Sequence, residues 1–254
     1  MDAHDLSDVA LAAQLAGEAG ALLADLRAYG DRTGKALGDA GDSAANSLIC
    51  NALRLARPHD GLLSEEEKDN SARLEHARVW IVDPLDGTRE YGEGRSDWAV
   101  HVALAVGGKP LVGAVALPGF DGSPVLRSDQ PAELPLATGK PRLVVSRTRP
   151  AAEALAVAEA LGGELIPMGS AGAKAMAVVL GQADIYLHSG GQYEWDSCAP
   201  VAVALAHGLH CSRLDGSPLI YNQRDTYMPD LLICRMEWAE RVLAILDLTK
   251  PRSS

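Results

Sequence analysis

Apolar residues recur at different spacings along this 254-residue chain, and each spacing predicts a different kind of element. Between Leu6 and Leu26 they return every three to four positions, as in an amphipathic helix that buries one face. A second helix is expected over Ser43–Arg57, because Pro58 cannot continue it. The stretch Gly30–Asp42 between them is rich in glycines and acids, and it is expected to be a surface loop.

Strand patterns follow. From Trp98 to Val106 every second residue is a large apolar one, Gly107–Pro110 suits a turn, and Leu111–Leu117 returns. This pattern predicts a hairpin in an antiparallel sheet. Prolines and polar residues dominate Ser123–Pro141, which predicts a long irregular connection, with room for short strands.

The second half of the chain alternates strand and helix patterns. Such a rhythm is typical of α/β architecture. The expected strands are Arg142–Ser146, Glu164–Pro167 and Ala183–Leu187, and the expected helices are Pro150–Leu161, Ser170–Leu180 and Asp196–Ala206. We therefore predict a boundary near residue 140, between sub-domains 1–140 and 141–254, with the smaller α/β part at the C-terminal end.

Composition places the chain among globular proteins and restricts its partners. It is 47% hydrophobic and 22% charged, and 23 basic against 34 acidic residues give a formal charge of -11. An acidic chain of this kind is not expected to bind nucleic acid or an acidic membrane surface. The four cysteines are scattered, which argues against a zinc site or a disulfide scaffold.

The N-terminal residues do not have the pattern of a targeting segment. Asp2, Asp5 and Asp8 are acidic, and no basic stretch precedes an apolar core, as a signal peptide would require. The sequence has no run of about 18 apolar residues, so no segment is expected to span a membrane. We therefore expect a cytoplasmic protein.

The strongest chemical signal is the segment Asp83-Pro84-Leu85-Asp86-Gly87-Thr88, directly after the apolar run Val79–Val82, which predicts a strand. Two carboxylates three residues apart, on a turn that proline stiffens, suit binding of hard cations. The backbone N–H groups after them suit binding of an anion. An Asp-Gly pair also fills ordinary turns, so the segment alone leaves a structural alternative open.

Two further segments place acids at the ends of predicted elements. Leu62–Glu67 ends in three glutamates, and Glu194–Pro200 places acids at the head of an apolar helical run. Carboxylate and carbonyl oxygens are the ligands that Mg²⁺ prefers. Cations beside an anion site are what phosphate-ester hydrolysis needs, because they neutralise the phosphoryl charge.

These three segments, in this order, resemble the signatures of the inositol monophosphatase superfamily, over almost the whole chain. The similarity is greatest to its CysQ-like branch, on the segments Glu194–Asp196, Gly169–Lys174 and Asp215–Asn222. The resemblance implies a layered α-β-α-β-α sugar-phosphatase fold, of the α/β (α+β) class, with a mixed or antiparallel N-terminal sheet. It also implies lithium sensitivity and, as is common in the family, a homodimer.

The resemblance implies two Mg²⁺ ions bridged by Asp83. The first would also be held by Glu65 and the backbone carbonyl of Leu85, and the second by Asp86 and Asp196. A third, weaker ion beside Glu65 is a further family feature, which makes two or three ions per site.

It also implies that Thr88, held by Asp42, orients the attacking water and relays its proton, with Glu65 as a further catalytic residue. The stretch before Asp42 departs from the family pattern, so Asp39 stays an alternative partner of Thr88. The implied substrate-binding residues are Leu85, Asp86, Gly87, Thr88, Ser170, Lys174 and Asp196. Asp196 also stands where a helix N-cap is expected, and capping is compatible with metal ligation.

Contacts beyond the scissile phosphate have several candidates. Gly169-Ser170 opens a predicted helix and suits a second anion, with Lys174 either reaching that anion or solvated on the helix. Arg147 and Arg149 are candidates for a 5′-phosphate. Tyr193 and Trp195 either stack on a base or, for Trp195 above all, belong to the core. The histidines His101, His207 and His210 are expected to be structural.

The resemblance thus implies a Mg²⁺-dependent phosphomonoesterase that removes the 3′-phosphate of 3′-phosphoadenosine 5′-phosphate, giving AMP, in sulfate assimilation. The nearest alternative is a phosphatase of the same superfamily for inositol 1-phosphate or fructose 1,6-bisphosphate. A third hypothesis is an inactive nucleotide- or metal-binding regulator, which the complete set of acids disfavours.

Overall fold

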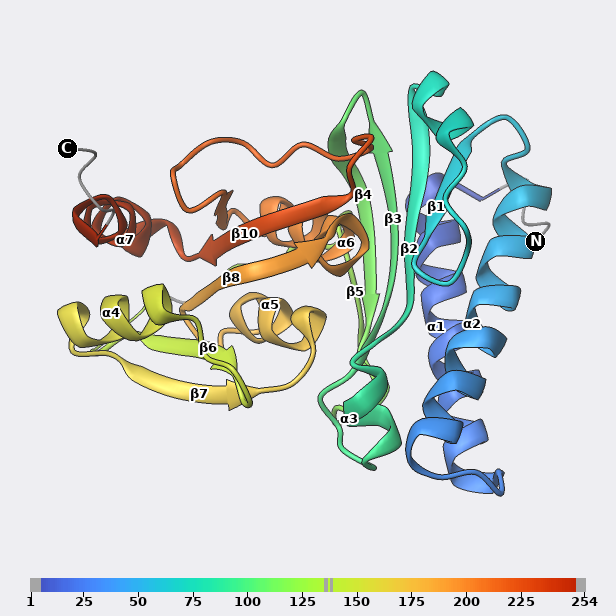
Figure 1. Cartoon of the computed structure of the whole chain (residues 1–254), viewed down its shortest axis with the longest axis horizontal. Helices are drawn as coiled ribbons and strands as arrows, with labels where there is room; N and C mark the ends of the chain where they lie inside the picture. The colour runs from blue at the N-terminus through green and yellow to red at the C-terminus, as the bar shows by residue number, and fades with distance from the viewer. Residues whose placement is uncertain (1–5, 135–136, 138, 250–254) are drawn as a thin grey trace.

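The computed structural model describes residues 6–134, 137 and 139–249, so Asp2 and Asp5 lie outside the described part. Five layers follow one another across the molecule in Figure 1: a helix pair, a sheet, a second helix pair, a second sheet and a third helix pair. This arrangement confirms the predicted α-β-α-β-α fold. The N- and C-terminal ends lie at opposite ends of the long axis.

The first sheet has five strands in the order β1-β2-β3-β4-β5. Its strands are β1 (Gly61–Ser64), β2 (Arg78–Asp86), β3 (Ala99–Val106), β4 (Lys109–Ala116) and β5 (Val125–Arg127). Only β1 and β2 run parallel, and the other neighbours are antiparallel. The predicted hairpin is therefore confirmed as β3–β4, and β5 is a short strand inside the expected irregular connection.

Helices α1 (Asp8–Tyr29) and α2 (Gly34–Ala56) cover the outer face of this sheet. The prediction of a loop over Gly30–Asp42 is wrong from Gly34 onward. The small residues of this stretch are needed for close packing, because a Cβ on Gly38 would come within 2.7 Å of Thr88 Cγ2. Tertiary contacts thus override the low helix propensity of glycine.

By length and mean hydropathy alone, α1 is apolar enough to cross a membrane, although polar residues interrupt it and it has no run of about 18 apolar residues. Its apolar residues instead pack against the sheet: Leu11, Leu15 and Leu23 are buried in one core with Val100 and Ala114. The helix is therefore a core helix of this fold.

The second sheet has the order β7-β6-β8-β10-β9. Its strands are β6 (Arg142–Ser146), β7 (Glu164–Met168), β8 (Ile185–Tyr193), β9 (His210–Ser212) and β10 (Tyr227–Cys234). The helices α4 (Ala152–Leu161) and α7 (Met236–Thr249) cover its outer face, and α5 (Ala171–Val179) and α6 (Glu194–Ala206) lie between the sheets. The α/β pattern of the second half is confirmed, and β9, β10 and α7 are additional elements.

Each interface between layers has its own hydrophobic core. One core joins α1 and α2 to the first sheet, one fills the space between the sheets, and one joins α4 and α7 to the second sheet. The middle core contains residues from both sides of position 140, including Val115 and Val178. The division into sub-domains 1–140 and 141–254 follows the change of sheet and stays a prediction.

Candidate active site

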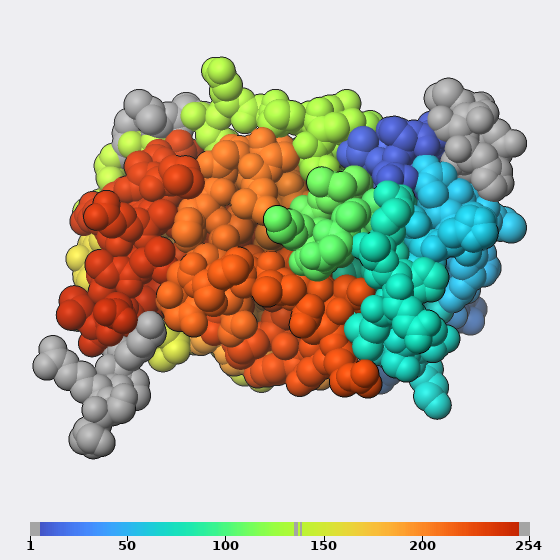
Figure 2. Space-filling model, turned by 90° about the horizontal axis from the view of Figure 1, so that it is seen from above, coloured from blue at the N-terminus to red at the C-terminus, as the bar shows by residue number. Residues whose placement is uncertain are grey.

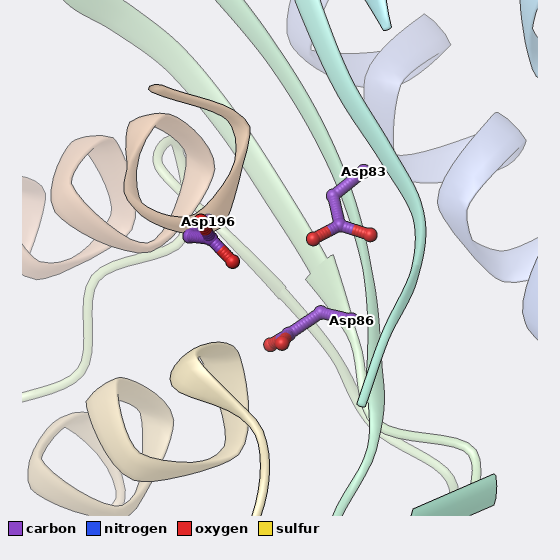
Figure 3. A group of neighbouring side chains, drawn as sticks. All are labelled: Asp83, Asp86 and Asp196. Atoms are coloured by element: carbon purple, nitrogen blue, oxygen red, sulfur yellow. The ribbon is translucent and has the colours of Figure 1, made fainter. Parts of the chain in front are cut away.

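Three aspartates converge where the middle layer meets the first sheet. Asp83 and Asp86 come from β2, and Asp196 comes from the first turn of α6 (Figure 3). One carboxylate oxygen of each lies within 4.8 Å of the others. An irregularity in the β2–β3 pairing falls between Asp83 and Asp86. Side chains three apart in a regular strand point to opposite faces, so this irregularity allows both to face the same point.

Asp83 carries much of the electrostatic strain of the cluster. It is 1% exposed, and its Oδ1 accepts a hydrogen bond from the backbone N–H of Leu85 at 3.1 Å. Burial, together with repulsion from Glu65 and Asp86, raises the pKa of Asp83 well above its ordinary value. A cation between these carboxylates would relieve that repulsion.

Asp86 is compensated in a different way. Its Oδ1 accepts the N–H of Ala171 at 3.1 Å and its Oδ2 the N–H of Gly172 at 2.5 Å. Burial alone would raise the pKa of Asp86, but His101, the N–H of Gly172 and Lys174 outweigh it and lower that pKa. Asp86 therefore stays ionised at neutral pH, held by the start of α5.

His101 is the site residue that the sequence analysis placed among structural histidines. It is fully buried on β3, in register with Asp83 on β2. Its Nε2 lies 3.3 Å from Asp86 Oδ2, and its Nδ1 lies 3.1 Å from the carbonyl of Trp195. These acceptors outweigh the effect of burial and raise the pKa of His101. Strand pairing was the signal that could have found it.

The other two histidines fit the structural prediction. His207 Nδ1 lies 2.8 Å from the carbonyl of Val203, one helical turn earlier. His210 Nε2 lies 2.9 Å from the hydroxyl of Ser212. These contacts lie within or beside their own elements, away from the acidic cluster.

Asp196 is not the N-cap of α6, because the helix begins at Glu194. It occupies the third helical position, and its Oδ2 accepts the backbone N–H of Tyr193, the N-cap residue, at 2.6 Å. The prediction that Asp196 is the N-cap is therefore wrong in position, although its side chain does accept the N–H of the cap residue. The role of Asp196 as a metal ligand stays a prediction. Burial and repulsion from Asp86 raise the pKa of Asp196 to about 6.

Glu65 and Asp42 extend the acidic cluster. Glu65 is solvent-accessible, yet desolvation of its carboxyl and repulsion from Asp196 and Asp42 raise its pKa to about 8. Burial and the charge of Glu66 raise the pKa of Asp42 to about 7, against the effect of the Thr88 hydroxyl. Asp42 is 6% exposed, and its Oδ1 has no hydrogen-bond partner among the described residues.

The two candidate partners of Thr88 differ in their surroundings. Asp39 is exposed and pairs with Lys35 at 2.6 Å, whereas Asp42 is buried and interacts with the hydroxyl of Thr88. That hydroxyl donates to the carbonyl of Leu85 at 3.1 Å. The burial of Asp42 and the effect of the Thr88 hydroxyl on its pKa thus favour Asp42 over Asp39 as the partner of Thr88.

Gly87 makes the turn between β2 and the short helix α3 (Thr88–Gly92). Its φ of 88° lies in the left-handed region that favours glycine. A Cβ there would also come within 2.9 Å of Ser170 Cβ on the opposite side of the site. The glycine therefore fixes both the turn and the close approach of the two segments.

The donor set fits a hard divalent cation. Asp83, Asp86 and Asp196 offer carboxylate oxygens only, and the carbonyl of Leu85 lies in the same turn. Such oxygens suit Mg²⁺. Burial raises the pKa of Asp83 and of Asp196, and repulsion from neighbouring carboxylates raises both further. The candidate ligands of the sequence analysis are thus brought to one place, although their roles stay predictions.

A model of the inositol monophosphatase family matches residues 5–248. The chain belongs to this family. Among curated relatives, 3′-phosphoadenosine 5′-phosphate phosphatase from Mycobacterium leprae is 50% identical over 95% of this chain and 94% of its own. The Mycobacterium tuberculosis (strain CDC 1551 / Oshkosh) phosphatase of the same name is 52% identical, over 91% and 90%.

More distant relatives agree with this membership. The 3′(2′),5′-bisphosphate nucleotidase CysQ of Escherichia coli K12 is 32% identical over 74% of this chain and 81% of its own. The crystal structure of CysQ from Bacteroides thetaiotaomicron matches with a TM-score of 0.78 and 25% identity, over 92% of this chain and 99% of that one. The predicted superfamily and the prediction of a CysQ-like phosphatase are confirmed.

The second anion site that the sequence analysis predicted at Gly169-Ser170 is not open. The N–H groups of Ala171 and Gly172 at the start of α5 are taken by Asp86, and the Ser170 hydroxyl accepts the N–H of Ala173 at 2.9 Å. Lys174 is 4% exposed, so it is not the solvated lysine of the alternative prediction. Its ammonium donates to the carbonyls of Gly169 and Ser170, and burial lowers its pKa to about 8.

The two arginine candidates also differ. Arg147 is engaged by acids of the α3 segment, with Nε at 2.9 Å from Glu90 and Nη2 at 2.7 Å from Glu93. Arg149 is exposed next to it. A 5′-phosphate would therefore have to compete with glutamates for Arg147, while Arg149 faces solvent.

A second buried polar region adjoins the site and was missed by the sequence analysis. Arg73, in the short helix η1 (Ser71–Glu75), is 3% exposed and donates to Asp69, to Asn222 and to the carbonyl of Gln223. Glu194 accepts the N–H groups of Asn222 and Gln223, each at 2.6 Å. We call these five residues the arginine network.

The arginine network joins three segments that are far apart in the sequence. In Figure 2 the orange segment that carries residues 213–226 lies against the teal segment of η1 and the green β3–β4 turn. Tyr221 donates its N–H to Gly108 in that turn at 2.9 Å. The network thereby ties the region after Glu65 to the start of α6, two residues before Asp196.

Proposed function

We propose that this chain is a Mg²⁺-dependent phosphomonoesterase that removes the 3′-phosphate of 3′-phosphoadenosine 5′-phosphate, giving AMP and phosphate. The observation that carries the proposal is 50–52% identity, over 91–95% of the chain, to mycobacterial proteins of that name. The acidic cluster supports it independently, since its donors suit the cations that phosphate-ester hydrolysis uses.

Asp83, Asp86, Asp196, Glu65 and the carbonyl of Leu85 would hold two or three Mg²⁺ ions, and these ions would neutralise the phosphoryl charge. Asp86 needs no change of protonation to take part, because His101 and the start of α5 already keep it ionised. The α5 start and His101 therefore position a ligand rather than bind the substrate.

Thr88 and Asp42 would hold and deprotonate the attacking water. The Asp42 carboxyl is buried beside Thr88, and a pKa of about 7 suits a group that accepts a proton near neutral pH. The N–H groups of Gly87 and Thr88, at the start of α3, would receive the phosphate oxygens. Ser170, which closely approaches Gly87, and Lys174 stay proposed substrate contacts, but the Lys174 ammonium would have to exchange its bonds to the carbonyls of Gly169 and Ser170 to reach a phosphate.

The same residues would serve inositol 1-phosphate or fructose 1,6-bisphosphate, since they treat only the shared phosphate. An inactive regulator is disfavoured because Glu65, Asp83, Asp86, Thr88 and Asp196 are all present. The proposal includes a role in sulfate assimilation, a cytoplasmic location, inhibition by lithium at a Mg²⁺ position and the possibility of a homodimer. A Mg²⁺-saturated assay that is insensitive to lithium would count against the lithium part.

The deciding experiment measures phosphate release in Mg²⁺ from the bisphosphate nucleotide, inositol 1-phosphate and fructose 1,6-bisphosphate. We expect kcat/KM for the nucleotide to exceed the other two by about a hundredfold, which is about 2.7 kcal/mol. Comparable values would mean a generalist phosphatase, and the sulfur-pathway part would be withdrawn. The Asp83→Asn variant, purified in the same way, reports any contaminating phosphatase.

A further inference from the structure

Three aromatic side chains beside Asp196 form a single cluster, which we call the aromatic platform: Tyr193, Trp195 and Tyr227. The rings of Tyr193 and Trp195 are stacked, with centroids 4.8 Å apart and planes 11° apart. The ring of Tyr227 meets that of Tyr193 edge-on, at 6.1 Å and 81°. These are favourable geometries for aromatic pairs.

The two tyrosines of the aromatic platform are about half exposed. Tyr193 is 47% and Tyr227 48% exposed, whereas Tyr91, Tyr186 and Tyr221 are at most 1% exposed. Trp195 is partly buried and packs on the core between the sheets. The platform thus has a rigid inner side and a solvent-facing outer side.

The backbone of two platform residues is hydrogen-bonded to residues of the site. The backbone N–H of Tyr193 donates to Asp196 Oδ2 at 2.6 Å, and the carbonyl of Trp195 accepts from His101. Two residues of the platform are therefore anchored through their backbone to the residues that flank the proposed position of the scissile phosphate.

The two tyrosines face each other across paired strands, which fixes their relative position. Tyr227 on β10 is in register with Tyr193 on β8. Gly191, with φ of 94°, leaves room for the Tyr227 ring, because a Cβ there would lie within 2.5 Å of it. His188 Nε2 lies 3.1 Å from the carbonyl of Gly191, at the irregularity in the β8–β10 pairing. The strands and the glycine thus present the rings in a defined arrangement.

We propose that the aromatic platform binds the purine base of the substrate by stacking. The proposal rests on the proposed function and names the part of the site that selects a nucleotide. Bases gain binding energy on aromatic rings in a way that does not depend on hydrogen-bond readout. Inositol and fructose phosphates have no π face, so the platform favours the nucleotide through KM while the acidic cluster treats all phosphates alike.

The test uses Mg²⁺-loaded enzyme hydrolysing 3′-phosphoadenosine 5′-phosphate, inhibited by AMP or by ribose 5-phosphate, which lacks the base. In Tyr193→Leu we expect KM and the Ki of AMP to rise at least about tenfold, equivalent to about 1.4 kcal/mol. The Ki of ribose 5-phosphate and kcat should change less than about twofold. Tyr193→Phe keeps the ring and should behave as wild type.

Tyr227→Leu gives a second, independent variant, with a smaller rise in the Ki of AMP of about threefold. Tyr29→Leu is the matched control, since Tyr29 is 87% exposed at the end of α1, and it should change nothing. Folding of each variant is checked by its thermal transition.

The outcomes separate the two proposals. If wild type does not hydrolyse the bisphosphate nucleotide, the proposed function fails. If it does, but the Tyr193→Leu and Tyr227→Leu variants leave the Ki of AMP unchanged or weaken AMP and ribose 5-phosphate equally, only the stacking proposal is overturned. A loss of dimer mass with unchanged Ki values would assign the platform to a subunit interface instead, and would also overturn it.

Discussion

Two buried polar regions meet at the first turn of α6, and they are built on opposite principles. In the arginine network, Glu194 accepts two N–H groups and Arg73 reaches three partners. In the acidic cluster, Asp83 accepts one N–H and faces other carboxylates. Burial raises the pKa of Glu194 to about 7. The pKa of Asp83 is raised both by burial and by repulsion from neighbouring carboxylates.

This difference in pairing distinguishes a region that stabilises the fold from one that is suited to bind a ligand. A buried charge with matched partners holds segments together, and removing one partner is costly. A buried cluster of like charges costs stability in the free protein and is retained where something of opposite charge binds. The same contrast recurs within β2, where Asp86 is compensated by the start of α5 and Asp83 is not.

The largest effect should come from Asp83→Asn. Activity in Mg²⁺ should fall at least about 10³-fold, because a central ligand charge is lost. The metal-free protein should become more stable by about 1 to 2 kcal/mol at pH 8, since repulsion is relieved. Phosphate release and urea unfolding in EDTA measure the two effects.

Asp86→Asn is the matched control for this prediction. It should lose activity as well, but destabilise the metal-free protein by about 2 kcal/mol, because an amide cannot accept the N–H groups of Ala171 and Gly172 as the carboxylate does. If both variants are destabilised alike, Asp83 is a structural residue and the comparison fails.

Arg73→Met tests the other region. Breaking a buried pair should reduce the free energy of unfolding by about 3 kcal/mol. Arg54→Met removes a more exposed arginine paired with Glu67 and should cost less than about 1 kcal/mol. Urea unfolding in saturating Mg²⁺ compares them, and equal losses would show that the arginine network does not hold its three segments together.

The sequence predicted the site better than the contacts that hold it. Asp83, Asp86, Thr88 and Asp196 lie on a strand end and a helix start that local patterns and motifs reveal. The helix over residues 34–42 was missed because its glycines suit close packing, as Gly38 against Thr88 shows, and that depends on a segment fifty residues away.

Long-range pairing hid the remaining features. His101 meets Asp86 only through the register of β3 on β2, and Arg73 meets Asn222 across 149 positions. The start of α5 has the pattern of an anion site, and the anion it binds is a side chain of the same protein, Asp86. Local sequence shows a donor group without showing which acceptor reaches it.

Asp42 and Asp39 on α2 repeat the contrast between an unpaired buried acid and a paired one. Asp42→Asn should lower kcat by about 10²-fold with little change in KM, because a buried proton acceptor is lost. Asp39→Asn removes only an exposed pair with Lys35 and should change kcat less than about twofold. Larger loss in Asp39→Asn would reverse the assignment of the residue that supports Thr88.

The smallest effect concerns pH. In the folded, metal-free protein the pKa of Glu65 is raised to about 8 from an ordinary value of 4.5. Between these values the folded state binds more protons than the unfolded state, so the free energy of unfolding falls as pH rises from about 5 to 8. Since Glu65 is solvent-accessible, screening should limit its share to about 1 kcal/mol.

Glu65→Gln isolates that share. Urea unfolding in EDTA at pH 5.5 and pH 8.0 should show a smaller fall for the variant than for wild type, and saturating Mg²⁺ should reduce the fall in wild type. Asp86, whose pKa is lowered, titrates below this window and does not contribute. If the free energy of unfolding falls equally in wild type and in Glu65→Gln, Glu65 does not share the charge of the cluster. Its place among the proposed ligands would then have to be given up.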